Sequence, residues 1–192
     1  VAPSKQVYMV VDRPADDGLQ RQLRSAKWGL VPSWAKDPKI GNRMINARIE
    51  TAAEKPSFRR AWAKRRCLLP ADGYYEWYAG EGPKQPFFIH RTDGTSLAMA
   101  GLFEFWKHDE DWLVTCCVLT TSAPDDLGQI HDRMPLLVPR ENWAEWLDPE
   151  HIPDAGVVVP AMATGLEAYP VSTEVNNVRH NGAHLLDPLP AS

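Results

Sequence analysis

Residues 67–121 read CLLPADGYYEWYAGEGPKQPFFIHRTDGTSLAMAGLFEFWKHDEDWLVTCCVLTT. Alternating or β-rich runs, which favour strands, recur in this stretch at residues 67–70, 73–78, 86–91, 97–105 and 112–121. Turn-forming residues follow two of these runs, namely Ala79-Gly80-Glu81-Gly82 and Asp93-Gly94. The stretch therefore predicts a mainly antiparallel sheet in which residues 73–105 form a meander.

The flanking segments add two strands and three helices to this prediction. The strands are expected at residues 6–11 and 27–31. Helical patterns occur at residues 51–64, 123–130 and 140–147, and Thr51 and Glu54 have the spacing of a capping box. The fold class is therefore α+β: a single domain over residues 1–192, with a curved, mostly antiparallel sheet or partial β-barrel flanked by short helices.

The charges are unevenly distributed along the chain. Residues 1–66 hold 15 Lys and Arg against 6 Asp and Glu, whereas the remainder holds 6 against 19, which together give the net charge of −4. A local positive field of this kind can attract polyanions even when the whole protein is acidic. The alternative is that the basic residues form only the solvated side of a helix. They include Arg59, Arg60, Lys64, Arg65 and Arg66.

No apolar run reaches the roughly 20 residues that cross a bilayer, and the N-terminus lacks the pattern of a signal peptide. We therefore expect no membrane partner and a cytoplasmic protein. Its three cysteines, Cys67, Cys116 and Cys117, lack CxxC spacing, so neither a disulfide framework nor a zinc knuckle is indicated. His180 and His184 are four residues apart, but Gly182 weakens a helix between them and no third ligand is evident. We expect no metal and no cofactor.

Two segments combine polar residues with aromatic or apolar neighbours. In INARIE (residues 45–50), Asn46 could orient a nucleophile and Arg48 could hold a phosphate, although Asn46 could equally cap a helix or turn. In GYYEWY (residues 73–78), alternation places Glu76 on one strand face with Tyr74 and Tyr78. If that face is inward, burial raises the Glu76 pKa and suits it to proton transfer; if outward, Glu76 is an ordinary surface charge.

Two more segments carry groups suited to catalysis or to DNA contact. QIHDRMP (residues 129–135) combines the imidazole of His131 with a carboxylate, a guanidinium and an apolar tip. Arg133 could hold a phosphate, while Met134 and Pro135 could wedge beside an unstacked base. KWGLVPSW (residues 27–34) places Trp28 and Trp34 in a basic neighbourhood, where they could stack on bases of a single strand or could fill the core.

Taken together and in this order, the segments resemble the SRAP family, named for SOS response-associated peptidases. The similarity covers most of the chain, and the segments that carry it are WGLVPSW, INARIET with EKPSFRRAW, RCLLPADGYYEW, KQPFFI, AGLFEFW, LTTSA, IHDRMP and PVSTEVNNVRHNGAHLL. The resemblance implies a sensor of abasic sites in single-stranded DNA that forms a covalent thiazolidine cross-link through an N-terminal cysteine. It also implies an autoproteolytic peptidase activity in the DNA damage or SOS response.

The resemblance also implies roles for particular residues. Asn46, Glu76 and His131 match the family's catalytic positions. The expected DNA-binding residues are Trp28, Arg48, Arg133, Met134 and Pro135. The family's Cys-Gly-Arg start is absent here, so we expect a gene start upstream of Val1 and an inactive truncated chain. We expect a monomer, which would be nucleoid-associated in a bacterium or nuclear in a eukaryote.

Two alternatives from other functional classes remain open. The chain could be a noncovalent single-stranded DNA-binding module that has lost catalysis. It could also be a thiol hydrolase that uses Cys67 or Cys116 with His131 and Asn46. The cysteines lie in apolar runs with no evident means of lowering a thiol pKa, which speaks against the hydrolase.

Overall fold

The computed structural model describes residues 1–78, 80, 82–123, 127, 129–153 and 165–190. The chain forms two compact units. The first unit comprises residues 1–70, 98–121 and 135–161, and the second comprises residues 71–97, 122–134 and 162–192.

The first unit contains a small β-barrel built from five strands. They are β1 (Gln6–Ala15), β2 (Gly18–Trp28), β4 (Arg66–Ala71), β7 (Leu97–His108) and β8 (Asp111–Ser122). Neighbouring strands pair in the order β2-β1-β4-β7-β8, and a parallel pairing of Lys27 and Trp28 with Thr115 and Cys116 joins β2 to β8. This last pairing closes the ring. The predicted α+β class, with a mostly antiparallel partial barrel and short helices, is confirmed.

The main hydrophobic core lies between one face of the barrel strands and the helices that cover it. Leu102, Cys117 and Leu119 of the strands are fully buried in this core together with Ala52 and Trp146 of the helices. Gly101 on β7 permits the close packing: a Cβ at this position would lie 2.9 Å from the Sγ of Cys67. The barrel interior is therefore filled by side chains and has no room for a larger residue at position 101.

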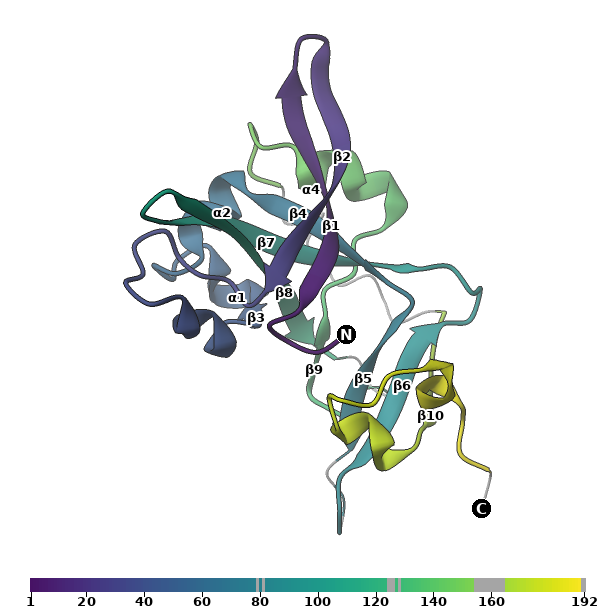
Figure 1. Ribbon diagram of the computed structural model, residues 1–192. Coiled ribbons are helices and arrows are strands. Elements are labelled where there is room, and N and C mark those ends of the chain that lie inside the picture. Colours follow the sequence, from purple (N-terminus) through teal and green to yellow (C-terminus); the bar gives the residue numbers. More distant parts are fainter. Residues whose placement is uncertain (79, 81, 124–126, 128, 154–164, 191–192) are drawn as a thin grey trace. The chain divides into compact units, whose positions relative to one another are not determined.

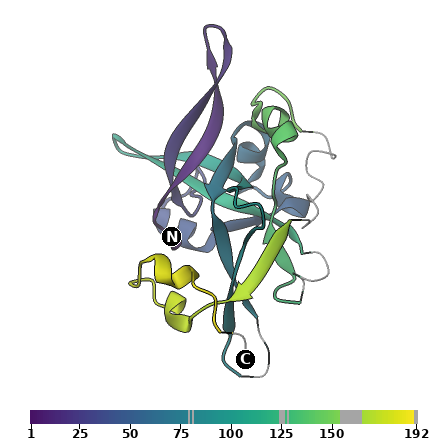
Figure 2. The same cartoon turned by 90° about the vertical axis from the view of Figure 1, so that its right-hand side faces the viewer.

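A long hairpin of β1 and β2 extends beyond the rest of the first unit (Figures 1 and 2). Its strands pair antiparallel from Gln6 opposite Lys27 to Ala15 opposite Gly18. The predicted strand at residues 27–31 is wrong in its bounds, since β2 ends at Trp28. Gly29 follows with a φ of +127°, and a Cβ there would lie 2.6 Å from the carbonyl oxygen of Gly41. The chain turns at Gly29, where both the positive φ and the close approach of the two backbones require glycine.

Short helices surround the barrel. They are η1 (Pro38–Arg43), α1 (Ile49–Ala52), α2 (Arg59–Lys64), η2 (Arg140–Asn142) and α4 (Trp143–Leu147). The predicted helix at residues 51–64 is wrong as one element, since Pro56 lies in the break between α1 and α2 and cannot donate a helical hydrogen bond. The predicted capping box is also wrong: Thr51 lies inside α1, and its hydroxyl has no hydrogen-bond partner in the described part of the chain. The prediction at residues 140–147 is confirmed by η2 and α4.

The second unit is built on a three-stranded antiparallel sheet. β6 (Gln85–Arg91) lies between β5 (Gly73–Tyr78) and β10 (Leu166–Pro170). The predicted meander over residues 73–105 is therefore correct for its first two strands and wrong for the third. β7 instead forms a hairpin with β8, and β10, which the sequence analysis did not predict, occupies the second edge of β6.

The C-terminal segment packs on this sheet with η4 (Thr173–Asn176) and η5 (Ala183–Leu186). The Tyr75 hydroxyl donates to the Leu185 carbonyl, and the Tyr169 hydroxyl donates to that of Leu186. The short strand β9 (Arg133–Pro135) completes the described elements, together with β3 (Asn46–Arg48), which pairs in parallel with β8. The predicted helix at residues 123–130 falls largely on residues 124–126 and 128, which lie outside the described residues.

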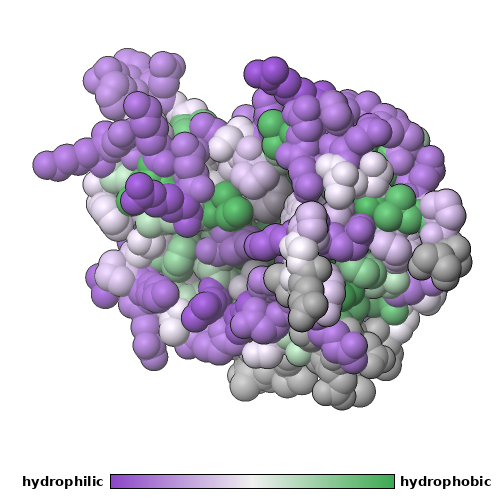
Figure 3. Space-filling model, turned by 90° about the horizontal axis from the view of Figure 1, so that it is seen from below, coloured by the Kyte–Doolittle hydropathy of each residue, from purple (hydrophilic) through white to green (hydrophobic). Residues whose placement is uncertain are grey.

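No helix within the described residues is both long and apolar enough to cross a membrane. Hydrophilic side chains cover most of the face shown in Figure 3, and hydrophobic atoms appear there as separate patches. The prediction of one domain over residues 1–192 stays a prediction.

Candidate functional site

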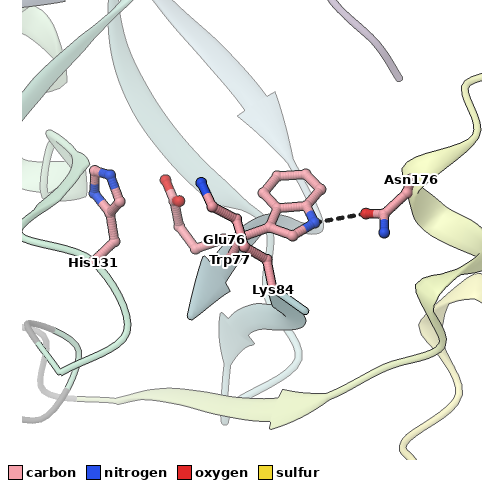
Figure 4. Close-up of a pocket in the computed structure, with 5 residues that line it drawn as sticks. All are labelled: Glu76, Trp77, Lys84, His131 and Asn176. Carbon is pink, nitrogen blue, oxygen red and sulfur yellow. Dashed lines mark hydrogen bonds between the residues drawn. The ribbon is translucent and has the colours of Figure 1, made fainter. Parts of the chain in front are cut away.

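A polar pocket lies in the second unit, where two of the segments predicted to take part in catalysis meet. It has a volume of about 420 Å³ and is lined by Glu76, Trp77, Lys84, His131 and Asn176. Figure 4 shows the carboxylate of Glu76 between the imidazole of His131 and the amine of Lys84. Two of the three predicted catalytic residues, Glu76 and His131, therefore meet in one pocket.

Glu76 is positioned by β5, where it stands opposite Phe87 of β6. It is half-buried, and this burial raises the pKa of its carboxyl above the ordinary value; the nearby His131 and a backbone hydrogen bond from Trp77 partly offset the rise. The inward alternative for this strand face thus describes Glu76 better than the surface one. A carboxyl with a raised pKa can both donate and accept a proton closer to neutral pH.

The hydroxyl of Tyr74 lies on the same strand face as Glu76. It is buried and has no hydrogen-bond partner among the described residues. Burial is the main cause of the raised pKa of this phenol, and the charge of Glu76 adds to it. Tyr74 therefore stays a neutral phenol and contributes a low-polarity wall beside Glu76.

His131 is oriented by the backbone and not by the carboxylate next to it in sequence. The Arg133 N–H donates to Nδ1 of His131 at 3.0 Å. Asp132 lies 3.4 Å from the same nitrogen, but its side chain is 88% exposed, which screens its charge. The carbonyl oxygen of Arg133 also lies 3.2 Å from Nδ1, so the imidazole is held at this nitrogen by the backbone of Arg133.

Three pocket residues were not assigned roles from the sequence. Trp77 donates through Nε1 to Oδ1 of Asn176 at 2.7 Å, the bond drawn in Figure 4. Asn176 ends η4, and this short helix begins with a hydrogen bond from the Glu174 N–H to the Ser172 hydroxyl. Lys84 directly precedes β6. All three belong to segments that carried the family resemblance, which was the available signal.

Asn46 and Arg48 lie in the first unit, on β3. Both are exposed and share one face of the strand, while Ala47 between them is buried. Helix α1 begins after Arg48 without a side-chain cap, so capping does not account for Asn46. The geometry leaves Asn46 and Arg48 available to a ligand, and their roles stay predictions.

The two tryptophans of residues 27–34 differ in exposure. Trp28 is half-buried and donates through Nε1 to the Ile45 carbonyl at 2.9 Å, which ties β2 to the chain just before β3. Trp34 is 56% exposed, and its neighbour Ser33 accepts a hydrogen bond from Arg60 of α2. An exposed indole suits base stacking, so the core-filling alternative fits Trp28 better than Trp34.

The other three residues that were predicted to contact DNA are more buried than Trp34. Met134 is 2% exposed and Pro135 is also buried, whereas Arg133 is half-buried. A wedge beside a base needs an exposed apolar tip, so this burial argues against the assignment of Met134 and Pro135. The DNA contacts of all three residues stay predictions.

The internal cysteines are poor nucleophiles. Cys67, Cys116 and Cys117 are free and buried, and burial raises the thiol pKa of Cys67 well above its ordinary value and that of Cys116 to about 12. Neutral thiols react slowly, because the thiolate is the reactive form. The hydrolase alternative therefore loses its nucleophile.

His180 and His184 do not share a helix. Each instead lies near the carboxylate of Glu174, at 3.8 and 3.5 Å. Among the described residues, no group of three His, Cys, Asp or Glu side chains has an arrangement that could hold a metal ion.

Comparison with known proteins places these features in a family. The family model described as "SOS response associated peptidase (SRAP)" matches residues 1–178. The chain is 41% identical to "Abasic site processing protein YoaM" of Bacillus subtilis, over 97% of this chain and 83% of the relative. It is 36% identical to "Abasic site processing protein YedK" of Escherichia coli, over 98% and 83%.

A solved structure supports the fold. The crystal structure of a protein from Bacteroides thetaiotaomicron superposes with a TM-score of 0.80 at 24% identity, and covers 97% of this chain and 82% of its own. The family match over nearly the whole chain and the identities of the relatives agree. This chain belongs to the SRAP family of SOS response associated peptidases.

Proposed function

We propose that this protein processes abasic sites in single-stranded DNA by covalent attachment through an N-terminal cysteine, the nucleophile that the family resemblance implies. The observation that carries the proposal is the pocket in which Glu76, with its raised pKa, lies beside His131. The relatives' names support abasic DNA as the substrate. The DNA damage response is the corresponding cellular setting.

The chemistry follows from the aldehyde that an abasic sugar exposes when its ring opens. An α-amine has an unperturbed pKa of about 7.7–8.0, so an appreciable fraction is neutral at physiological pH. The amine adds to the aldehyde carbon, water leaves, and the cysteine thiol then adds to the resulting imine carbon. The product is a thiazolidine ring, which resists reversal and protects the strand from cleavage.

Glu76, His131 and Asn46 each have a defined task in this reaction. The carboxyl of Glu76 moves protons while the amine adds and water leaves, which its raised pKa favours. His131 donates its Nε2 proton to the ring oxygen of the sugar as the ring opens, since its Nδ1 is engaged by the backbone. Asn46 positions the amine or thiol through its side-chain amide.

DNA binding is assigned to cationic and aromatic residues. Arg48 and Arg133 hold phosphates on either side of the lesion, and Trp28 contributes to the channel for the strand. Trp34, with its exposed indole, offers a stacking surface in the first unit. The protein acts as a monomer. The peptidase activity is autoproteolytic and exposes the terminal cysteine.

The test is a denaturing gel of the complete gene product after incubation with a single-stranded oligonucleotide that contains one abasic site. We expect a heat-stable shifted band, and no such band with a tetrahydrofuran analogue, which has no aldehyde. Noncovalent binding without any heat-stable band would instead identify a binding module, and the roles of Asn46, Glu76 and His131 would be withdrawn.

A further inference from the structure

The pocket contains an amine that the proposed reaction does not use. Lys84 lines it together with Glu76 and His131, and its side chain is exposed. Among the described residues, no ion pair or hydrogen bond engages its amine. Figure 4 shows the amine on the side of the Glu76 carboxylate opposite to His131.

Other lysines of the chain lie in different surroundings. Lys64 lies 4.0 Å from the carboxylate of Glu150, and Lys107 lies over the ring of Trp112. Neither lines the pocket that contains Glu76 and His131. Lys84 thus combines a nucleophilic atom type with two neighbouring groups that can transfer protons.

The backbone at Lys84 is held firmly. The adjacent Gln85 begins β6 opposite Tyr78, and its side-chain amide donates to the carbonyls of Pro86 and Val171. The Val171 N–H in turn donates to the Pro86 carbonyl. These bonds hold the first residues of β6, which directly follow Lys84.

We propose that Lys84 is a second covalent attachment point, which captures the aldehyde of an abasic site as an imine. This inference rests on the proposed function for the delivery of abasic DNA to the pocket. The neutral amine attacks the aldehyde carbon and forms a C–N bond while the carbonyl oxygen takes up a proton. The hydroxyl of this carbinolamine then leaves as water, with its proton supplied by Glu76 or His131, and a protonated C=N bond remains.

The two attachments differ in lifetime. A terminal cysteine closes its imine into a ring, whereas a lysine has no neighbouring thiol on its own side chain and its imine stays open to water. Attachment through Lys84 is therefore reversible. It holds the open-chain aldehyde in the pocket until hydrolysis returns the free amine.

Hydride trapping tests the proposal because borohydride reduces an imine to a stable secondary amine. The chain of residues 1–192 is incubated with an abasic single-stranded oligonucleotide and sodium borohydride, and the trapped product is mapped by peptide mass spectrometry. We expect the modification on Lys84. The Lys84→Arg variant, which keeps the charge but lacks a nucleophilic amine, should lose trapped product by about ten-fold or more.

The controls separate this inference from the proposed function. Lys107→Arg should trap as well as the unmodified chain, and the tetrahydrofuran oligonucleotide should give no product. Noncovalent affinity for abasic DNA is measured in parallel. If the DNA binds but Lys84→Arg traps normally, or the product maps to Val1 or another lysine, the Lys84 inference is overturned alone. If abasic DNA does not bind at all, both proposals fail.

Discussion

The two units differ in how their buried ionisable side chains are paired. In the first unit, the guanidinium of Arg66 donates to backbone carbonyls, and Arg65 pairs with Glu104 at 2.8 Å. In the second unit, Glu76 is half-buried with a raised pKa, and the Tyr74 hydroxyl has no partner in the described part of the chain. Satisfied polar groups stabilise a fold, while perturbed ones are typical of reactive sites. We infer that the first unit supplies stability and the second supplies proton-transfer chemistry.

The largest expected effect is on Arg66. Its guanidinium donates to carbonyls on α2, on α4 and in the chain that follows α4, and the residue is 3% exposed. Arg66→Met keeps the stem but leaves these buried acceptors without donors, so the free energy of unfolding should fall by about 3–5 kcal/mol. Urea denaturation measures it. Exposed Arg59→Met on α2 is the matched control, with an expected change within about 0.5 kcal/mol.

The second-largest expected effect concerns Glu76, the proposed proton-transfer group of the second unit. Glu76→Gln removes the titrating proton but keeps the shape, so the cross-linking rate of the complete gene product should fall by about 100-fold at neutral pH. Affinity for the abasic strand, measured by native gel, should stay nearly unchanged. An unaltered cross-linking rate would remove Glu76 from proton transfer and weaken the assignment of chemistry to the second unit.

A third change tests the packing of the barrel without touching charge. Gly101→Ala places a Cβ about 2.9 Å from both the Sγ of Cys67 and the Cδ1 of Leu69. Both are buried within the barrel, so the clash should cost about 1–3 kcal/mol of unfolding free energy. Thermal or urea unfolding would show it. If the variant is as stable as the unmodified chain, the side chains of Cys67 and Leu69 can shift to accept the added methyl group.

The smallest expected effect concerns pH. Because the folded state raises the Glu76 pKa, its protonated form stabilises the fold below the ordinary glutamate pKa of about 4.3, and this contribution is lost as pH rises through the folded value. Glu76→Gln should therefore gain stability relative to the unmodified chain between pH 4 and pH 8. Solvent screening limits the gain to less than about 1 kcal/mol. Paired urea titrations at both pH values measure it, and a gain in the opposite direction would contradict the raised pKa.

Local sequence patterns predicted the bounds of β7 and β8 more accurately than those of β2. β7 and β8 are rich in apolar residues and were expected close to their observed bounds. Most of β2 was missed because GLQRQLRS carries few apolar residues: it pairs with β1 but remains largely exposed. The start of β6 was found, but its partner β10 was not, because that pairing joins residues about 80 positions apart and leaves no local signal.

The same distinction applies to the site. Glu76 and His131 could be selected from their own neighbours in sequence, and the structure brings them to one pocket. Asn176 and Lys84 could not, because their places depend on how the C-terminal segment packs against β5 and β6. Burial, which argues against a role for Met134 in DNA contact, is likewise a property of the folded chain.

Because its three thiols are buried, opening of the barrel can be followed by thiol labelling. Cys67, Cys116 and Cys117 all belong to β4 and β8, so a maleimide dye has no described cysteine to label in the second unit. Labelling of these three residues requires that the structure around them opens, and its rate under native conditions therefore measures those openings. One cysteine added on the surface of the second unit would serve as an internal reference, because its labelling rate can be compared with that of the buried thiols in the same experiment.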